Sequence, residues 1–239
     1  MKLWKNLLCF IVSVWLVFGE PVLVFASGDN EPEGITDSIY MTSEHQEKIE
    51  ELKKKVDDYV NSNISTYSGV SGRLNVPLYQ QTKTNNCSSA CIQMVVNYLS
   101  ASPYEQEDIM DYQKAKYLKE WTYVYAVTGT LNHYVGGYEH IRTSDIAFTT
   151  AIQYSIGQNR PIICQVNTAE LPNYTDGKGC NHYVVATGYY FAYSGSSYRD
   201  EVYYNDPHYD EDYFGRFTCT AAQMSSCINA HSKYYIGSA

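Results

Sequence analysis

The spacing of apolar residues changes once along this chain, close to Gly157, and this change limits the folds open to it. Before the glycine, apolar residues recur at helical spacing, as Ala90, Met94 and Val95 do within the stretch 87–99. After it, runs of β-branched and aromatic residues alternate with turn residues. Helices followed by strands that turns connect predict an α+β fold with an antiparallel sheet.

The expected helices and strands follow this division. The helices are expected over 87–99, with Asn86 as N-cap, over 105–118 and over 144–156. The strands are expected over 161–167, 182–191, 201–205, 214–218 and 234–236. The stretch TGTLNHYVGGYEHI at 128–141 contains several glycines and is expected to form a loop.

The first 26 residues have the layout of an export signal. Two lysines precede an uncharged apolar run over 7–18, and residues 24–26 have the spacing of a cleavage site. Glu20 and Pro21 interrupt the apolar stretch before it reaches the roughly 20 residues that a membrane-spanning helix needs. We therefore expect cleavage after residue 26 and a secreted protein that meets the membrane only during export.

The segment 27–72 separates this signal from the compact domain. Residues 27–42 are polar and predict a flexible leader, whereas residues 43–60 place apolar residues at helical spacing among charges and predict a helix. Two interpretations remain open: a solvated helix resting on the domain, or a propeptide that blocks a cleft. Residues 61–72 are rich in Ser, Asn and Gly and predict a linker, which leaves a compact domain over 73–239.

Composition excludes several classes of protein. The 239 residues are 44% hydrophobic and 18% charged, which excludes a disordered chain and allows one substantial core. Lys and Arg total 17 against 26 Asp and Glu, and no basic stripe is present, so nucleic acid is not an expected partner. A monomer is expected.

Export determines how the cysteines are interpreted, because an oxidising exterior permits disulfides. Cys9 leaves with the signal, and six cysteines remain. An even number allows three bridges, but a working thiolate would leave at least one further thiol unbridged. Cys219 and Cys227 flank a short helical stretch and are the most plausible pair.

Cys87 lies where a helix is expected to begin. Unpaired backbone N–H groups and the helix dipole favour a thiolate there, which makes Cys87 the candidate nucleophile. His182 opens an apolar strand and is the candidate general base, and Asp206 follows at the distance of one strand, a turn and the neighbouring antiparallel strand. Gln81, six positions before Cys87, is the candidate oxyanion donor together with the Cys87 N–H; Gln80 is the next candidate.

Four segments together, VPLYQQTKTNNCSSACIQMVVNYL, RPIICQVN, NHYVVATGYY and VYYNDP, resemble the papain-like superfamily, specifically its branch of bacteriocin-processing (double-glycine leader) peptidases. The resemblance covers most of residues 74–223 and implies a papain-like α+β fold in a bacterial cysteine peptidase that needs no cofactor. It implies catalysis through a thioester, with an oxyanion donor, a nucleophile, a general base and a group that orients the base: Gln81, Cys87, His182 and Asp206, respectively.

The chain departs from that pattern in two ways. Relatives usually have Cys-Gly-Pro-Ala or Cys-Trp-Ala-Ala, whereas this chain has Cys-Ser-Ser-Ala at 87–90. It also carries no transporter within its 239 residues, so leader-peptide maturation is not implied.

Other interpretations of the same residues remain. Cys91 has the setting of a small buried residue. A zinc site from Cys87, Cys91, Cys180 and His182 would have unusual spacing, and the acidic stretch 206–212 lacks the pattern of a calcium loop. A transglutaminase-type acyl transferase would use the same Cys, His and Asp order. A catalytically silent, disulfide-stabilised binding module is the alternative from another class.

Overall fold

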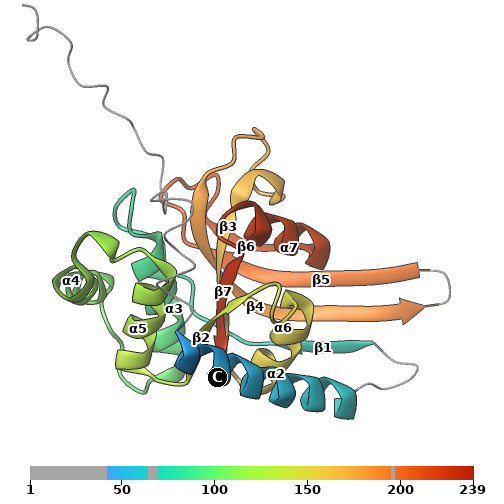
Figure 1. Ribbon diagram of the computed structural model, residues 1–239. Helices are drawn as coiled ribbons and strands as arrows, with labels where there is room; N and C mark the ends of the chain where they lie inside the picture. Colours follow the sequence, from blue (N-terminus) through green and yellow to red (C-terminus); the bar gives the residue numbers. More distant parts are fainter. Residues whose placement is uncertain (1–41, 64–68, 195–196) are drawn as a thin grey trace, which may run out of the picture.

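The computed structural model describes residues 42–63, 69–194 and 197–239 (Figure 1). The predicted export signal, its cleavage position and nearly all of the predicted leader lie outside these ranges. Among the helices within them, none combines the length and the apolar character needed to cross a membrane.

The elements follow one another as the sequence division predicts, with most helices before most strands. The helices are α2 (Ser43–Asn63), α3 (Cys87–Leu99), α4 (Gln106–Tyr117), α5 (Val124–Tyr134), α6 (Phe148–Gly157) and α7 (Ala221–Ala230), with short 3₁₀ turns η1 (Leu118–Glu120) and η2 (Thr168–Glu170). The strands are β1 (Val70–Arg73), β2 (Tyr138–Arg142), β3 (Ile162–Asn167), β4 (Asn181–Ser194), β5 (Ser197–Asp206), β6 (Gly215–Thr220) and β7 (Tyr234–Ser238).

The strands form one sheet in which every pair is antiparallel, in the order β2-β7-β3-β4-β5-β6. The long strand β4 pairs with β3 through 181–186 and with β1 through 188–191. The β4–β5 hairpin extends beyond the rest of the sheet (Figure 1). The predicted α+β class with an antiparallel sheet is confirmed.

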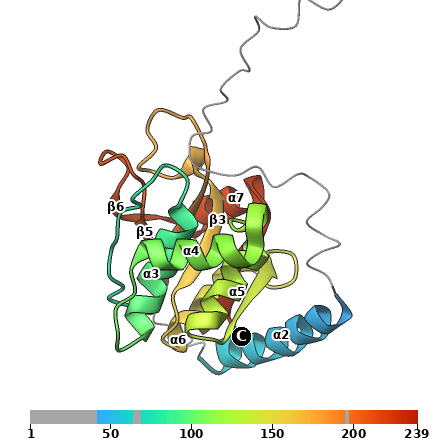
Figure 2. The same cartoon turned by 90° about the vertical axis from the view of Figure 1, so that its left-hand side faces the viewer.

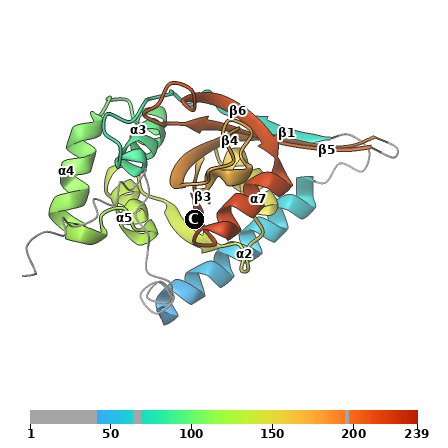
Figure 3. The same cartoon turned by 90° about the horizontal axis from the view of Figure 1, so that it is seen from above.

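Both faces of the sheet are covered, as the alternation of β3 shows. Ile162, Cys164 and Val166 pack in one core with residues of α2, α6 and α7. Ile163 points the other way, into a second core with residues of α3, α4 and α5. Figures 2 and 3 show these two helical layers from other sides. The first turn of α3 belongs to the second core, and it lies against the sheet close to the beginning of β4.

The expected loop over 128–141 is wrong, because α5 and β2 occupy most of it. Gly129 lowers the helical propensity of this stretch, yet it lies inside α5. The Tyr117 hydroxyl packs closely over this position, so the glycine lies at a helix contact and not at a turn.

The predicted linker over 61–72 also contains regular structure. Helix α2 continues to Asn63, and β1 pairs with β4 in a register that places Val70 opposite Phe191. The pairing is possible because Gly188 leaves room for the neighbouring strand, where a Cβ atom would lie 2.5 Å from the Gly72 carbonyl oxygen. The chain upstream of residue 73 thus contributes to the sheet.

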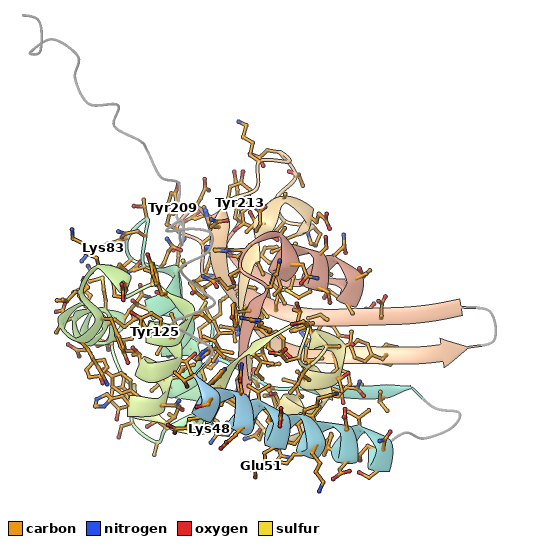
Figure 4. The ribbon with its side chains drawn as sticks, viewed as in Figure 1. Lys48, Glu51, Lys83, Tyr125, Tyr209 and Tyr213 are labelled. Atoms are coloured by element: carbon orange, nitrogen blue, oxygen red, sulfur yellow. The ribbon has the colours of Figure 1, made fainter. Side chains whose placement is uncertain are left out.

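Helix α2 packs on the domain through a single apolar stripe. Ile49, Leu52 and Val56 are buried in the core that contains α6, and the ring of Tyr59 meets Tyr154 edge to face at 5.6 Å. Figure 4 shows Lys48 and Glu51 of α2 at the opposite end of the molecule from Lys83, Tyr209 and Tyr213. This is the arrangement expected of a helix that rests on the domain.

The Leu52→Ala variant tests whether α2 is a stabilising part of the domain. Leu52 is 2% exposed, so removing its side chain leaves a cavity and is expected to lower the free energy of unfolding by about 2–4 kcal/mol. Urea denaturation of this variant, with the exposed neighbour Lys53→Ala as control, measures the difference. Equal stability of the two variants would show that α2 does not contribute to the folded domain.

Candidate active site

Cys87 is the first residue of α3, and the preceding turn holds it there. Asn86 occupies the N-cap position but its side chain does not cap the helix, contrary to expectation. Its Oδ1 instead accepts a hydrogen bond from the Lys83 N–H at 3.0 Å, and its Nδ2 donates to Thr82 and to Gln106. The Asn86 side chain therefore leaves the backbone N–H groups of the first turn to other acceptors, which favours an anion at this position.

His182 and Asp206 come from the ends of two neighbouring strands. Val185 of β4 pairs with Asn205 of β5, so Asp206 lies diagonally opposite His182 on the same face of the sheet. The His182 Nε2 atom lies 2.9 Å from the Asp206 Oδ1 atom, and both side chains are fully buried. The sequence separation of His182 and Asp206 predicted two adjacent antiparallel strands, and in the structure the two side chains are in direct contact.

The other ring nitrogen of His182 lies on the Cys87 side. Cys87 and His182 line the same small pocket. The His182 Nδ1 atom is buried and makes no hydrogen bond of normal geometry within the described residues. Burial alone would lower the pKa of His182, but the charges and hydrogen bonds of Asp206 and Cys87 outweigh it and raise the pKa well above its usual value. The imidazole is therefore stabilised in its protonated form.

Two other histidines near this pair have the opposite tendency. Burial and the neighbouring His182 lower the pKa of His208, whose Nδ1 accepts a hydrogen bond from the Asp210 N–H at 3.0 Å. Burial lowers the pKa of His231, which lines the pocket, to about 4. Of these three histidines, His182 is therefore the one that favours the protonated, positively charged form at neutral pH.

Gln81 is buried in the loop that leads to Cys87. Its backbone N–H donates to the Pro207 carbonyl at 2.7 Å, next to Asp206, and its Nε2 donates to the Lys83 carbonyl at 2.7 Å. An amide nitrogen carries two N–H donors, so one remains for a further acceptor. Gln80, the other candidate, is directed away, because its Nε2 donates to the Tyr209 carbonyl.

Four of the five other cysteines in the described residues are unsuited to nucleophilic chemistry. Cys219 and Cys227 carry unbridged thiols, so the predicted disulfide between them is wrong; both serve as small apolar residues in the core. Burial raises the pKa of Cys219 to about 12 and that of Cys227 to about 11. Burial also raises the pKa of Cys91 and Cys164 well above the usual value. These four thiols remain protonated at neutral pH.

The zinc interpretation of the cysteines is not supported by the geometry. Within the described ranges, only one group of three or more possible ligand side chains gathers at metal-binding distances, and it lies elsewhere, at His45, Glu139 and His140. The acidic stretch after Asp206 forms a turn in which Asp210 accepts a hydrogen bond from the Asp212 N–H.

A known protein family matches the part of the chain that contains this site. The model of the peptidase C39-like family matches residues 73–234, which contain Gln81, Cys87, His182 and Asp206. The chain belongs to the peptidase C39-like family. It is therefore a cysteine-type peptidase, and its substrates are peptides or proteins. The predicted resemblance to bacteriocin-processing peptidases is confirmed.

Two solved structures are similar to this C39-like peptidase. One is a double glycine motif protease from an AMS/PCAT transporter in complex with the leader peptide, with 17% identity over 72% of this chain and 96% of the other, and a TM-score of 0.41. The other is UfSP from C. elegans, with 12% identity over 73% of this chain and 35% of the other, and a TM-score of 0.44. No curated protein matches the sequence.

The C39-like site contains supporting residues that sequence analysis missed. Besides His182, Asp206 accepts hydrogen bonds from the His208 N–H at 3.0 Å, from Asn173 Nδ2 at 3.0 Å and from the Tyr174 hydroxyl at 3.1 Å. Tyr174 also stacks on Tyr213 with a ring separation of 4.7 Å. The four hydrogen bonds fix both carboxylate oxygens in a buried site, where an unpaired charge would be costly.

The Tyr174→Phe variant tests this support. It removes one hydrogen bond to Asp206 and keeps the stacked ring, so we expect kcat to fall about 10-fold and stability to fall by about 1–2 kcal/mol. Tyr213→Phe, which removes the hydroxyl of the stacked neighbouring ring but no hydrogen bond to Asp206, is the matched control for peptide turnover and thermal unfolding. A Tyr174→Phe enzyme as active as this control would exclude a positioning role for the hydroxyl.

The Asp206→Asn variant tests the electrostatic link. Because the Asp206 charge raises the pKa of His182, its removal lowers that pKa, and the protonated imidazole is lost at lower pH. In the wild-type enzyme the alkaline limb of kcat/KM against pH should lie well above pH 6.5, and in the variant it should move to lower pH. An unmoved limb would show that this limb reports a group other than His182.

Proposed function

We propose that this C39-like peptidase is an exported hydrolase that cleaves peptide or isopeptide bonds with a Cys87, His182 and Asp206 triad. The observation that carries the proposal is the position of His182, which joins Asp206 through Nε2 and shares the pocket with Cys87 on its other side. This is the arrangement that a base needs if it is to accept a proton from a nucleophile and be oriented by a third group.

In the first step the Cys87 sulfur attacks the scissile carbonyl carbon. The carbonyl π electrons move to oxygen, which becomes an oxyanion, and the thiol proton resides on His182. The Cys87 backbone N–H and the remaining N–H of Gln81 Nε2 stabilise the oxyanion. The preorganised turn before α3, which places the uncapped N–H groups at the sulfur, supports this assignment.

In the second step the tetrahedral intermediate collapses. The C–N bond breaks, His182 gives its proton to the leaving amine, and a thioester joins the acyl group to Cys87. Water then attacks the thioester, with His182 accepting its proton, and the carboxylic acid leaves as the Cys87–acyl bond breaks. Asp206 keeps Nδ1 of the ring directed at the reacting atoms and stabilises the imidazolium.

The fate of the thioester distinguishes this hydrolase from an acyl transferase of transglutaminase type. The protein is incubated with a diverse peptide library in the presence and absence of a small primary amine, and the products are identified by mass spectrometry. Free acids in both reactions support hydrolysis. Amides that replace the acids as soon as the amine is present would assign the protein to acyl transfer instead.

The export part of the proposal rests on residues 1–26. A bacterial host is given the full chain or a chain that lacks these residues. The full chain should appear in the medium with Ser27 as its first residue, and the shortened chain should remain in the cells. An intact N-terminus on cell-bound protein would argue for an anchor.

A further inference from the structure

A second group of chemically active side chains lies where α2 meets β2, away from the catalytic pocket. His45 lies in the first turn of α2, and Glu139 and His140 are consecutive residues of β2. One ligand atom from each of the three lies within 4.8 Å of the other two. The peptidase chemistry uses none of these residues.

The distances are close to those of a metal site. His45 Nδ1 lies 3.5 Å from Glu139 Oε2, and the rings of His45 and His140 stack with centroids 4.2 Å apart and planes at 9°. An imidazole binds a metal in its own ring plane, so one of the two stacked rings has to rotate before both nitrogens reach the same ion. Two ligand atoms on a tetrahedral zinc ion lie about 3.3 Å apart, so the widest gap has to close by about 1.5 Å or less. Side-chain rotation is sufficient for a shift of this size.

The Glu139 carboxylate and the two imidazoles lie in a protected position. His45 is 9% exposed and the Glu139 side chain 20%, so the group is largely shielded from water. The Lys48 ammonium group pairs with Glu44 at 3.0 Å on the exposed side of α2, outside the three-residue cluster.

We propose that His45, Glu139 and His140 bind one divalent transition-metal ion of the zinc type. Two imidazoles and a carboxylate form a donor set that zinc prefers, whereas magnesium and calcium prefer oxygen ligands. Three protein ligands leave the fourth position to water. The ligands come from α2 and from β2, an edge strand of the sheet, so the ion ties the helix α2 to the sheet. The site is separate from the triad, whose Cys87 and His182 line another pocket.

The test uses the full chain with Cys87→Ala and without a histidine tag, so that neither the candidate nucleophile nor a tag binds the metal. The chelator-treated protein is titrated with zinc in a calorimeter. We expect one equivalent of zinc to bind and saturating zinc to raise Tm by about 5 °C or more, while magnesium has no effect. Hydrogen exchange in α2 should slow when zinc is present.

Matched variants locate the ion. Glu139→Gln and His140→Ala in the same background should each weaken zinc binding at least about 100-fold, whereas His133→Ala, on α5, should leave it unchanged. Thermal unfolding without metal checks that each variant folds. Cobalt bound in place of zinc should show a tetrahedral spectrum without thiolate charge transfer. Absence of zinc binding, equal affinity in all variants, or a thiolate band would each overturn the proposal.

Discussion

The Cys87→Ala variant should lose peptide turnover almost completely, with kcat/KM falling by at least about 10⁴-fold. The reason is that Cys87 supplies the electron pair that forms the thioester, and no neighbouring group can replace it. Cys91, one turn further along α3, is fully buried, and burial raises its pKa well above the usual value. Turnover is measured on peptides that the wild-type protein cleaves.

Cys91→Ala is the matched control for this substitution. It removes a sulfur atom from the same helix but not from the pocket, so its effect should be limited to a modest loss of stability. If Cys87→Ala and wild type cleave the same peptides at equal rates, the assignment of the nucleophile is wrong. If Cys91→Ala is the inactive variant, the nucleophile is on the next turn.

Replacing His182 by alanine should lower kcat/KM by about 10³- to 10⁴-fold, because the proton of the thiol and the proton of the leaving amine both pass through this ring. The fall should be largest for substrates with poor leaving groups, since these depend most on the general acid. Peptide amides are therefore compared with activated esters. A variant that loses both activities equally would indicate damage to binding rather than loss of proton transfer.

Two variants separate this effect from unfolding. His182→Ala leaves Asp206 buried without its ring partner, so thermal unfolding is recorded alongside activity, and His182→Gln provides a polar replacement of similar size. His208→Ala is the matched histidine control, because it removes a buried ring near Asp206 but keeps the backbone N–H that bonds the carboxylate. Only the His182 variants should lose activity by orders of magnitude.

The fold class and the central site could be predicted because both depend on strong local patterns. The apolar residues of α3 recur on one face, and the prediction of a helix over 87–99 matches its observed bounds. The order of strands after Gly157 limits the neighbours of His182, so Asp206 could be paired with it before the structure was known. The register of β4 against β5 then brings the side chains of His182 and Asp206 into contact.

Features that depend on packing between distant elements could not be predicted. Gly129 in α5 has the local signature of a turn, and its close contact with Tyr117 inside a helix becomes visible only in the structure. Asn173 and Tyr174 belong to the loop before β4, and nothing in their local sequence marks them as partners of Asp206. The contact of His45 with Glu139 also arises only because α2 docks beside the edge of the sheet.

Labelling with a thiol-directed epoxide, followed by mapping of the modified peptides, tests the central claim most directly. The native protein should be labelled on Cys87 far faster than on any other cysteine, the half-buried Cys180 included, and His182→Ala should greatly reduce this rate because the imidazole accepts the thiol proton. The deeply buried thiols should react only after unfolding. An unmodified Cys87, or labelling of several cysteines at similar rates in the native protein, would contradict the assignment of Cys87 as the catalytic nucleophile.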